Sequence, residues 1–136
     1  MLKEVFEPKK VFSLDEANKT LPLVSRIVQD IVRTKQEMVK ALGRAKELAS
    51  QGRSAQSEGE QHRGQDLGFE IEGYLAELEK IGCLCKDPVL GLVDFPARVG
   101  GRIVFLCWKM GEPEIVYYHE LEDGFGGRKP VTGTFV

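Results

Sequence analysis

The fold of this chain is decided by residues 21–49, which read LPLVSRIVQDIVRTKQEMVKALGRAKELA. Apolar side chains recur in this stretch at steps of three and four residues, with one polar interruption at Lys35. This spacing is typical of a long amphipathic helix whose apolar seam packs against another helix. The seam consists of Leu21, Val24, Val28, Ile31, Lys35, Met38, Leu42, Ala45 and Ala49.

The start of the helical segment lies just upstream, at Ser13-Leu14-Asp15-Glu16. Ser13 followed three residues later by Glu16 is the spacing of a capping box, in which each side chain binds the other residue's backbone N–H. Pro22 lacks a backbone N–H and disfavours a helix interior. We therefore expect a long helical segment over 13–49 with a break near Pro22. Either a short helix ends near Leu21, or Pro22 occupies the first turn of a new helix.

Residues 50–65, SQGRSAQSEGEQHRGQ, contain almost no apolar side chains, which predicts a flexible linker. His62 lies in this stretch and is interpreted as a solvated loop residue. A second amphipathic segment over 66–81 carries apolar residues at helical spacing, and Gly82 is a good helix stop. Its seam consists of Leu67, Ile71, Tyr74, Leu78 and Ile81.

The two predicted helices differ in length, about 42 Å against about 24 Å at 1.5 Å per residue. The shorter helix cannot cover the whole seam of the longer one, and roughly 38–49 needs another cover. Long exposed apolar stripes are uncommon on monomers. The sequence therefore predicts a homodimer that forms at least partly through the long helix.

The segment 83–119 is typical of antiparallel strands separated by tight turns. Gly100-Gly101 is the clearest turn, and a two-residue turn there places Val99 opposite Arg102. Apolar residues then face both sides of the strand 102–109, so both sheet faces need a cover, one from the helices and one from the tail or a partner. The predicted strands are 83–86, 91–98, 102–109 and 114–119, followed by a Gly-rich turn and tail over 120–136.

These elements predict one α+β domain over residues 1–136, with a long antiparallel helical hairpin packed on a three- to four-stranded antiparallel meander sheet. The net charge of −2 argues against nucleic-acid binding, although residues 1–50 are basic and residues 51–81 acidic. The first ten residues hold no apolar run of signal-peptide length, and no run has the length of a membrane span. Three cysteines suit a reducing compartment, so we expect a cytoplasmic protein.

His119, Glu120 and Asp123 follow the last predicted strand and could bind a metal or perform acid–base chemistry. Because the spacing lacks helical HExxH geometry, the simpler interpretation is a strand-end histidine followed by a solvated acidic turn. Cys83, Cys85 and Cys107 lack the paired spacing of zinc sites and are interpreted as small core residues.

Asp94 lies in an otherwise apolar strand, where an unpaired carboxylate would be costly to bury. A structural pair with Arg98, Arg102 or Arg128 and a catalytic carboxylate are both open interpretations. The Gly-rich turn 124–130 could present backbone N–H groups to an anion, with Arg128 as a bidentate partner. The alternative is a turn whose glycines let the tail fold back over the sheet.

Several of these positions form a recurring pattern. The chain resembles a bacterial family called domain of unknown function 2203, over nearly its whole length outside 50–65. Tyr118 and Cys85 depart from the pattern, which more often has Trp and an aliphatic residue there. The resemblance implies no established activity, but it implies that Asp94, Arg102, Trp108, His119 and Arg128 belong to one recurring pattern, which favours a shared site. The matching motifs are Phe12–Asn18, Leu21-Pro22, Gly82-Cys83, Lys86-Asp87, Gly91–Pro96, Gly101-Arg102, Leu106–Trp108, Gly111-Glu112, His119, Gly124-Phe125, Gly127-Arg128 and Pro130.

Two classes of function follow from the sequence. The first is a non-catalytic, homodimeric binding or interaction module, because no catalytic constellation is complete. The second is a small anion- or metal-binding enzyme in which Asp94 or His119 acts as acid or base, and Arg102 and Arg128, with Trp108, bind an anionic ligand.

Overall fold

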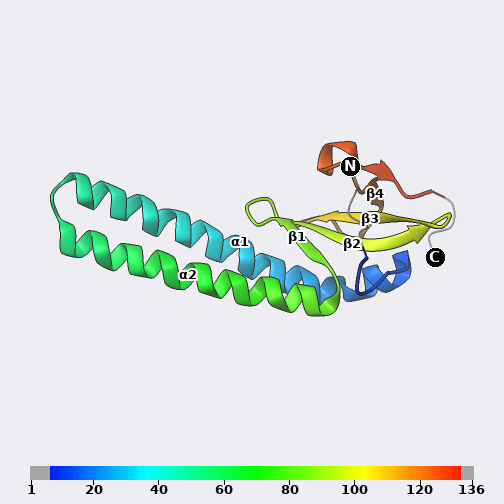
Figure 1. Cartoon of the computed structure of the whole chain (residues 1–136), viewed down its shortest axis with the longest axis horizontal. Coiled ribbons are helices and arrows are strands. Elements are labelled where there is room, and N and C mark those ends of the chain that lie inside the picture. The colour runs from blue at the N-terminus through cyan, green and yellow to red at the C-terminus, as the bar shows by residue number, and fades with distance from the viewer. Residues whose placement is uncertain (1–6, 133–136) are drawn as a thin grey trace.

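The computed structural model describes residues 7–132, which form a helical hairpin and a five-stranded sheet (Figure 1). The hairpin extends along the longest axis of the molecule, and the sheet lies beside the end of the hairpin that holds the start of the first helix. The elements are α1 (Leu14–Ser50), α2 (Ser54–Ile81), β1 (Leu84–Asp87), β2 (Leu92–Val99), β3 (Arg102–Lys109), β4 (Tyr117–Glu120), the 3-10 helix η1 (Phe125–Gly127) and β5 (Lys129–Pro130).

The capping box predicted for α1 is confirmed. The Ser13 hydroxyl accepts a hydrogen bond of 3.0 Å from the Glu16 N–H, and the Glu16 carboxylate accepts one of 3.2 Å from the Ser13 N–H. The predicted break near Pro22 is wrong, because α1 runs through it without interruption. Pro22 itself is exposed, whereas Leu21 and Val24 beside it are buried in the core. Burial of this apolar face outweighs the single backbone hydrogen bond that proline removes.

The predicted linker over 50–65 is also wrong, because α2 begins at Ser54 and only 51–53 connect the helices. The small side chains in this stretch are interhelical contacts. Ser57 is buried and donates a 2.7 Å hydrogen bond to the Ala45 carbonyl. Gly64 is buried directly under the side chain of Leu42. Small residues let two helices approach closely. The small side chains that predicted a linker in this stretch therefore reflect close packing between the helices. His62 is exposed, as predicted, but lies within α2.

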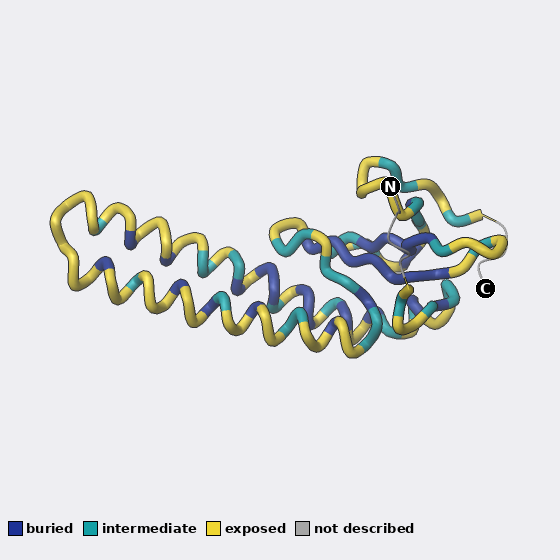
Figure 2. Tube along the Cα trace, viewed as in Figure 1, coloured by how far each residue is buried: buried dark blue, intermediate teal, exposed yellow. Residues whose placement is uncertain are grey.

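The length mismatch between the helices largely disappears. The two helices have 37 and 28 residues, so α2 extends beside most of α1. Ala41 and Ala45 are buried, although Val39 and Leu42 on the same stretch are exposed. Figure 2 shows that buried positions become sparse in the half of the hairpin that projects beyond the sheet. The homodimer therefore remains a prediction, but the argument from a long uncovered seam on the first helix no longer supports it.

The sheet is an antiparallel meander in the order β1-β2-β3-β4-β5, one strand more than predicted. The register expected from Gly100-Gly101 is confirmed, with Val99 opposite Arg102 and Val93 opposite Trp108. One face of the sheet packs on the helices, which joins both layers in one apolar core. This core includes Phe12, Val24, Val28, Ile31, Leu78, Val93, Phe95, Val104, Leu106 and Trp108.

The opposite face of the sheet, called the outer face below, carries Asp94, Phe105, Cys107 and His119. The segment that follows β4 folds back along this face, so that η1 and the helices lie on opposite sides of the sheet (Figure 1). The sequence left the tail or a partner as the cover of this face, and the described part of the tail lies against it at 121–125, while 133–136 lie outside the described residues. Across 7–132, neither helix is apolar enough over a sufficient length to cross a membrane.

Candidate functional site

The outer face brings together three polar side chains from three adjacent strands. Asp94 on β2 lies directly opposite Cys107 on β3, and His119 on β4 lies opposite Phe105, two positions from Cys107. Side chains two apart on a strand share a face, so all three point to the same side. Their ligand atoms lie within 4.8 Å of one another, and all three residues are buried. We call these residues the Asp–Cys–His cluster.

Both ring nitrogens of His119 have hydrogen-bond partners. Nδ1 lies 2.8 Å from the backbone carbonyl oxygen of Glu120, and because a carbonyl only accepts, Nδ1–H must be the donor. Nε2 lies 2.9 Å from Oδ1 of Asp94. One proton therefore lies between Nε2 and Oδ1, either on the imidazole or on the carboxyl. The side chains are only 5% and 3% exposed, which makes this a fully buried pair.

Burial dominates the electrostatics of the cluster. It raises the pKa of Asp94, opposed by hydrogen bonding and charge from His119 and by the charge of Lys86. Burial also raises the pKa of Cys107 to about 11, so Cys107 is a neutral thiol at neutral pH. A neutral thiol is a poor nucleophile. This argues against Cys107 as a catalytic nucleophile.

The cluster lines a cavity of about 180 Å³ on the outer face. The ammonium group of Lys86 stands 5.0 Å from the centre of the Phe105 ring at the edge of this cavity. The chain after β4 forms another part of the cavity wall, through 121–125. The lining comprises the cluster together with Lys86, Leu92, Phe105, Leu121, Asp123, Gly124 and Phe125.

Arg128 supports this wall from the side. Its guanidinium stacks between two aromatic rings, with its central carbon 3.9 Å from the centre of Tyr117 and 4.6 Å from that of Phe125. It also donates a hydrogen bond to the Glu112 carboxylate. Within 7–132, its Nη1 is a buried nitrogen without a hydrogen-bond partner. Glu112 and the two rings therefore position Arg128, and Phe125 connects it to the cavity.

Two other residues predicted for a shared site lie elsewhere. Arg102 pairs with Glu120 at the far end of the sheet, through hydrogen bonds of 2.9 and 3.1 Å that also lower the Glu120 pKa. Trp108 is buried on the helix-facing side, where its indole N–H donates to the Glu112 carbonyl. The arrangement expected from the resemblance is therefore split across the two faces of the sheet.

The metal-ligand set suggested by the sequence is also rearranged. Glu120 is adjacent to His119 in β4, so its side chain points to the opposite face, where Arg102 binds it. Asp123 lines the cavity but is exposed. Asp94 and Cys107 take the places next to His119. Sequence reasoning assigned Cys107 to the core, although the Gly100-Gly101 register already placed it opposite Asp94.

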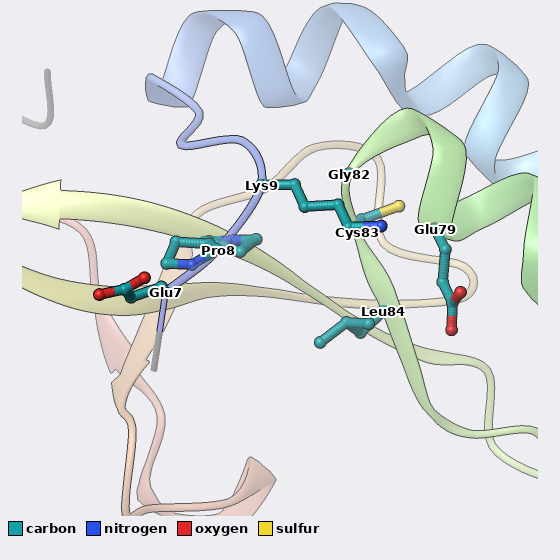
Figure 3. Close-up of a pocket in the computed structure, with 8 residues that line it drawn as sticks. Glu7, Pro8, Lys9, Glu79, Gly82, Cys83 and Leu84 are labelled. Carbon is teal, nitrogen blue, oxygen red and sulfur yellow. The ribbon is translucent and has the colours of Figure 1, made fainter. Parts of the chain in front are cut away.

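A second hollow lies between the chain before α1 and the start of β1 (Figure 3). Its base is apolar and includes Pro8, Leu84 and Cys83, whose pKa burial raises to about 12. The carboxylates of Glu7 and Glu79 lie at opposite sides of the view and do not converge. This hollow therefore lacks the converging polar groups of the outer-face cavity.

Fold and site together define an α+β protein with a long helical hairpin, a five-stranded meander and a buried Asp–Cys–His cluster on the outer face of the sheet. The family model described as "Uncharacterized conserved protein (DUF2203)" matches residues 10–131, and the chain belongs to this family. Neither a curated protein nor a solved structure matches the chain significantly.

Proposed function

We propose that this chain is a non-catalytic binding protein that holds a small ligand in the outer-face cavity through Asp94 and His119. The observation that carries this proposal is the buried 2.9 Å contact between these two side chains at the wall of a cavity. Burying an ion pair or a polar pair stabilises a fold little compared with apolar packing. A buried carboxyl group with a raised pKa at the wall of a cavity is instead a candidate functional group.

Binding is favoured over acid–base catalysis by the state of His119. Its Nδ1 donates to the Glu120 carbonyl and its Nε2 faces Asp94, so His119 can take a proton from a substrate only if its contact with Asp94 opens first. The two arginines proposed for an anionic substrate are engaged by carboxylates, Arg102 by Glu120 and Arg128 by Glu112. These contacts leave the second class of function, the small enzyme, with less support.

A thermal-shift screen of small anions, metal ions and metabolites tests the proposal. Asp94→Asn is the informative variant, because its amide can donate to Nε2 and preserve the pair while removing the carboxylate. We expect stabilising ligands to lose their effect in Asp94→Asn and His119→Gln and to keep it in Arg102→Gln. Ligands that stabilise all four proteins equally, or no stabilising ligand at all, would refute it.

We further propose that the protein is cytoplasmic and forms a homodimer through the hairpin. Support for the dimer comes from large apolar side chains on the projecting half, since Val39, Leu42 and Phe69 are 57%, 44% and 69% exposed. Light scattering at micromolar concentration should give twice the chain mass, and Val39→Glu should reduce it. A folded monomer under these conditions would contradict the dimer.

A further inference from the structure

We propose that the ligand of the outer-face cavity is a divalent transition-metal ion of the zinc class, bound by Asp94 Oδ1, Cys107 Sγ and His119 Nε2. This inference rests on the proposed function, since it names the ligand of the same cavity. The cluster is the one group of three potential metal-ligating side chains that converge in this way among residues 7–132.

The chemistry of the three donors selects the class of ion. Zinc is bound in proteins by cysteine sulfur, histidine nitrogen and carboxylate oxygen, and the cluster supplies one of each. Thiolate is a soft ligand that favours zinc and its neighbours over magnesium or calcium, which prefer oxygen donors. Cys107 therefore distinguishes this site from a general divalent-cation site.

The donor atoms already lie close to the spacing that a tetrahedral ion requires. Bonds of about 2.0–2.3 Å at tetrahedral angles place donor atoms about 3.3–3.8 Å apart. The structure has all three within 4.8 Å, with Nε2 and Oδ1 at 2.9 Å. Binding needs the nitrogen–oxygen pair to open by a few tenths of an ångström, which side-chain torsions can provide without moving the strands.

His119 is oriented in the manner of a metal ligand. Its Nδ1–H donates to the Glu120 carbonyl, which leaves Nε2 as the nitrogen that faces Asp94 and Cys107. Histidines that bind metals usually donate the other ring N–H to a carbonyl or carboxylate, and this bond fixes the tautomer. The outer hydrogen bond of a metal site is therefore present in β4 itself.

Charge balance also favours a dication at this buried position. The cluster holds two exchangeable protons, one on the Cys107 thiol and one between Asp94 and His119. A bound M²⁺ ion displaces both protons to solvent, forming metal–sulfur, metal–oxygen and metal–nitrogen bonds with no change of oxidation state. The dication, one thiolate and one carboxylate sum to zero, so the loaded site buries no net charge.

Three protein ligands leave one tetrahedral position, and all three of these residues line the cavity. The cavity offers room for water or a small anion on the metal, with Lys86 at its edge. Structural zinc sites usually have four protein ligands, whereas sites with three protein ligands, as in zinc enzymes, hold water or another small molecule at the fourth position. In the binding protein proposed above, this position takes a ligand without a reaction. The structure assigns this site to the open kind.

Metal binding is tested on the full chain after removal of metals with a chelator. Binding of cobalt(II) to the metal-free chain should produce a thiolate-to-metal charge-transfer band and release about two protons near neutral pH, and zinc should then abolish the band without further proton release. The band should vanish in Cys107→Ser and persist in Cys85→Ser, the matched control, because Cys85 lies in the apolar core layer on the other face. Asp94→Asn and His119→Gln should weaken zinc binding more than about tenfold, or 1.4 kcal/mol.

The result has a clear reading in each direction. A folded wild-type chain without the charge-transfer band, or a band unchanged in Cys107→Ser, overturns the metal inference. If no metal ion binds, but an organic or inorganic anion stabilises wild type and not Asp94→Asn, the proposed binding function stands and only the metal inference is refuted. If nothing binds at Asp94 and His119, both the proposed binding function and the metal inference are refuted.

Discussion

The pairing of Asp94 with His119 can be tested by a double-mutant cycle without knowledge of any ligand. The variants are Asp94→Ala, His119→Ala and the combination. Each single change removes one partner of a 2.9 Å contact between side chains that are 3% and 5% exposed. The remaining partner then lies in a buried position without its hydrogen bond.

The expected magnitudes follow from that burial. Leaving a buried polar group unpaired costs about 1–3 kcal/mol, and breaking a buried ion pair costs about 3–5 kcal/mol. His119→Ala also removes a ring that packs 5.5 Å from the Phe105 ring, so it should be the more damaging single change. Because the double variant leaves neither group unpaired, its loss should be smaller than the sum by about 1–3 kcal/mol.

Urea denaturation of the metal-free proteins measures the four free energies of unfolding. Asp94→Asn is the matched control, because its amide can donate to Nε2 and should cost less than Asp94→Ala. A coupling below about 0.5 kcal/mol, the usual scatter for independent sites, would refute a buried interacting pair. Equal losses for Asp94→Asn and Asp94→Ala would contradict a hydrogen bond between residue 94 and Nε2 of His119, because the amide of Asn can pair with this nitrogen and the methyl group of Ala cannot.

Three further predictions concern the scaffold. Pro22→Ala should raise the free energy of unfolding by about 2 kcal/mol. Removing proline from the helix interior stabilises the folded state by about 3 kcal/mol, and the greater conformational entropy of the unfolded chain offsets up to about 1 kcal/mol of this gain. A lower free energy of unfolding in urea would contradict an unbroken α1. Gly91→Ala should lower it by about 2–4 kcal/mol, because Gly91 has φ +75° and a Cβ there would lie 2.8 Å from the Met110 Cβ. Gly101→Ala, at φ +80° with nothing within 4 Å, is its control and should cost only the backbone part; equal losses would rule out the steric explanation. Hydrogen bonds from the Ser13 N–H and hydroxyl lower the pKa of Glu16. The stability contributed by ionised Glu16 should therefore be present above its ordinary pKa of about 4.3 and be lost as the pH falls through the lowered value. The urea midpoints of wild type and Glu16→Gln should converge in acid. A difference between these midpoints that stays constant with pH would contradict this prediction.

Features that depend on neighbours in the chain were predictable. The Ser13–Glu16 capping box, the apolar seam of α1 and the β2–β3 register follow from spacings of two to four residues. Such short-range patterns reflect local backbone geometry, which tertiary context changes little. The α+β class and the helical hairpin followed from these elements.

Interhelical packing decided where the helices begin and end. Pro22 and the stretch 54–65 both carry local signals against a helix, yet both are helical. Burial of Leu21, Val24, Ser57 and Gly64 overrides those signals, because the free energy of an apolar or close-packed interface exceeds a local propensity difference of about 1–3 kcal/mol.

The candidate site was only partly within reach of the sequence. Local register placed Asp94 and Cys107 on one face, but the position of β4 on β3 brings His119 beside them and turns Glu120 towards Arg102. A one-residue shift of β4 would have exchanged those two roles, since strand side chains alternate between faces. The amino-acid sequence by itself therefore determined a helical hairpin followed by an antiparallel meander and the β2–β3 register, whereas only the tertiary structure decided where the helices begin and end and which polar side chains meet. Contacts between distant residues depend on register and burial, which no short stretch of the chain determines alone.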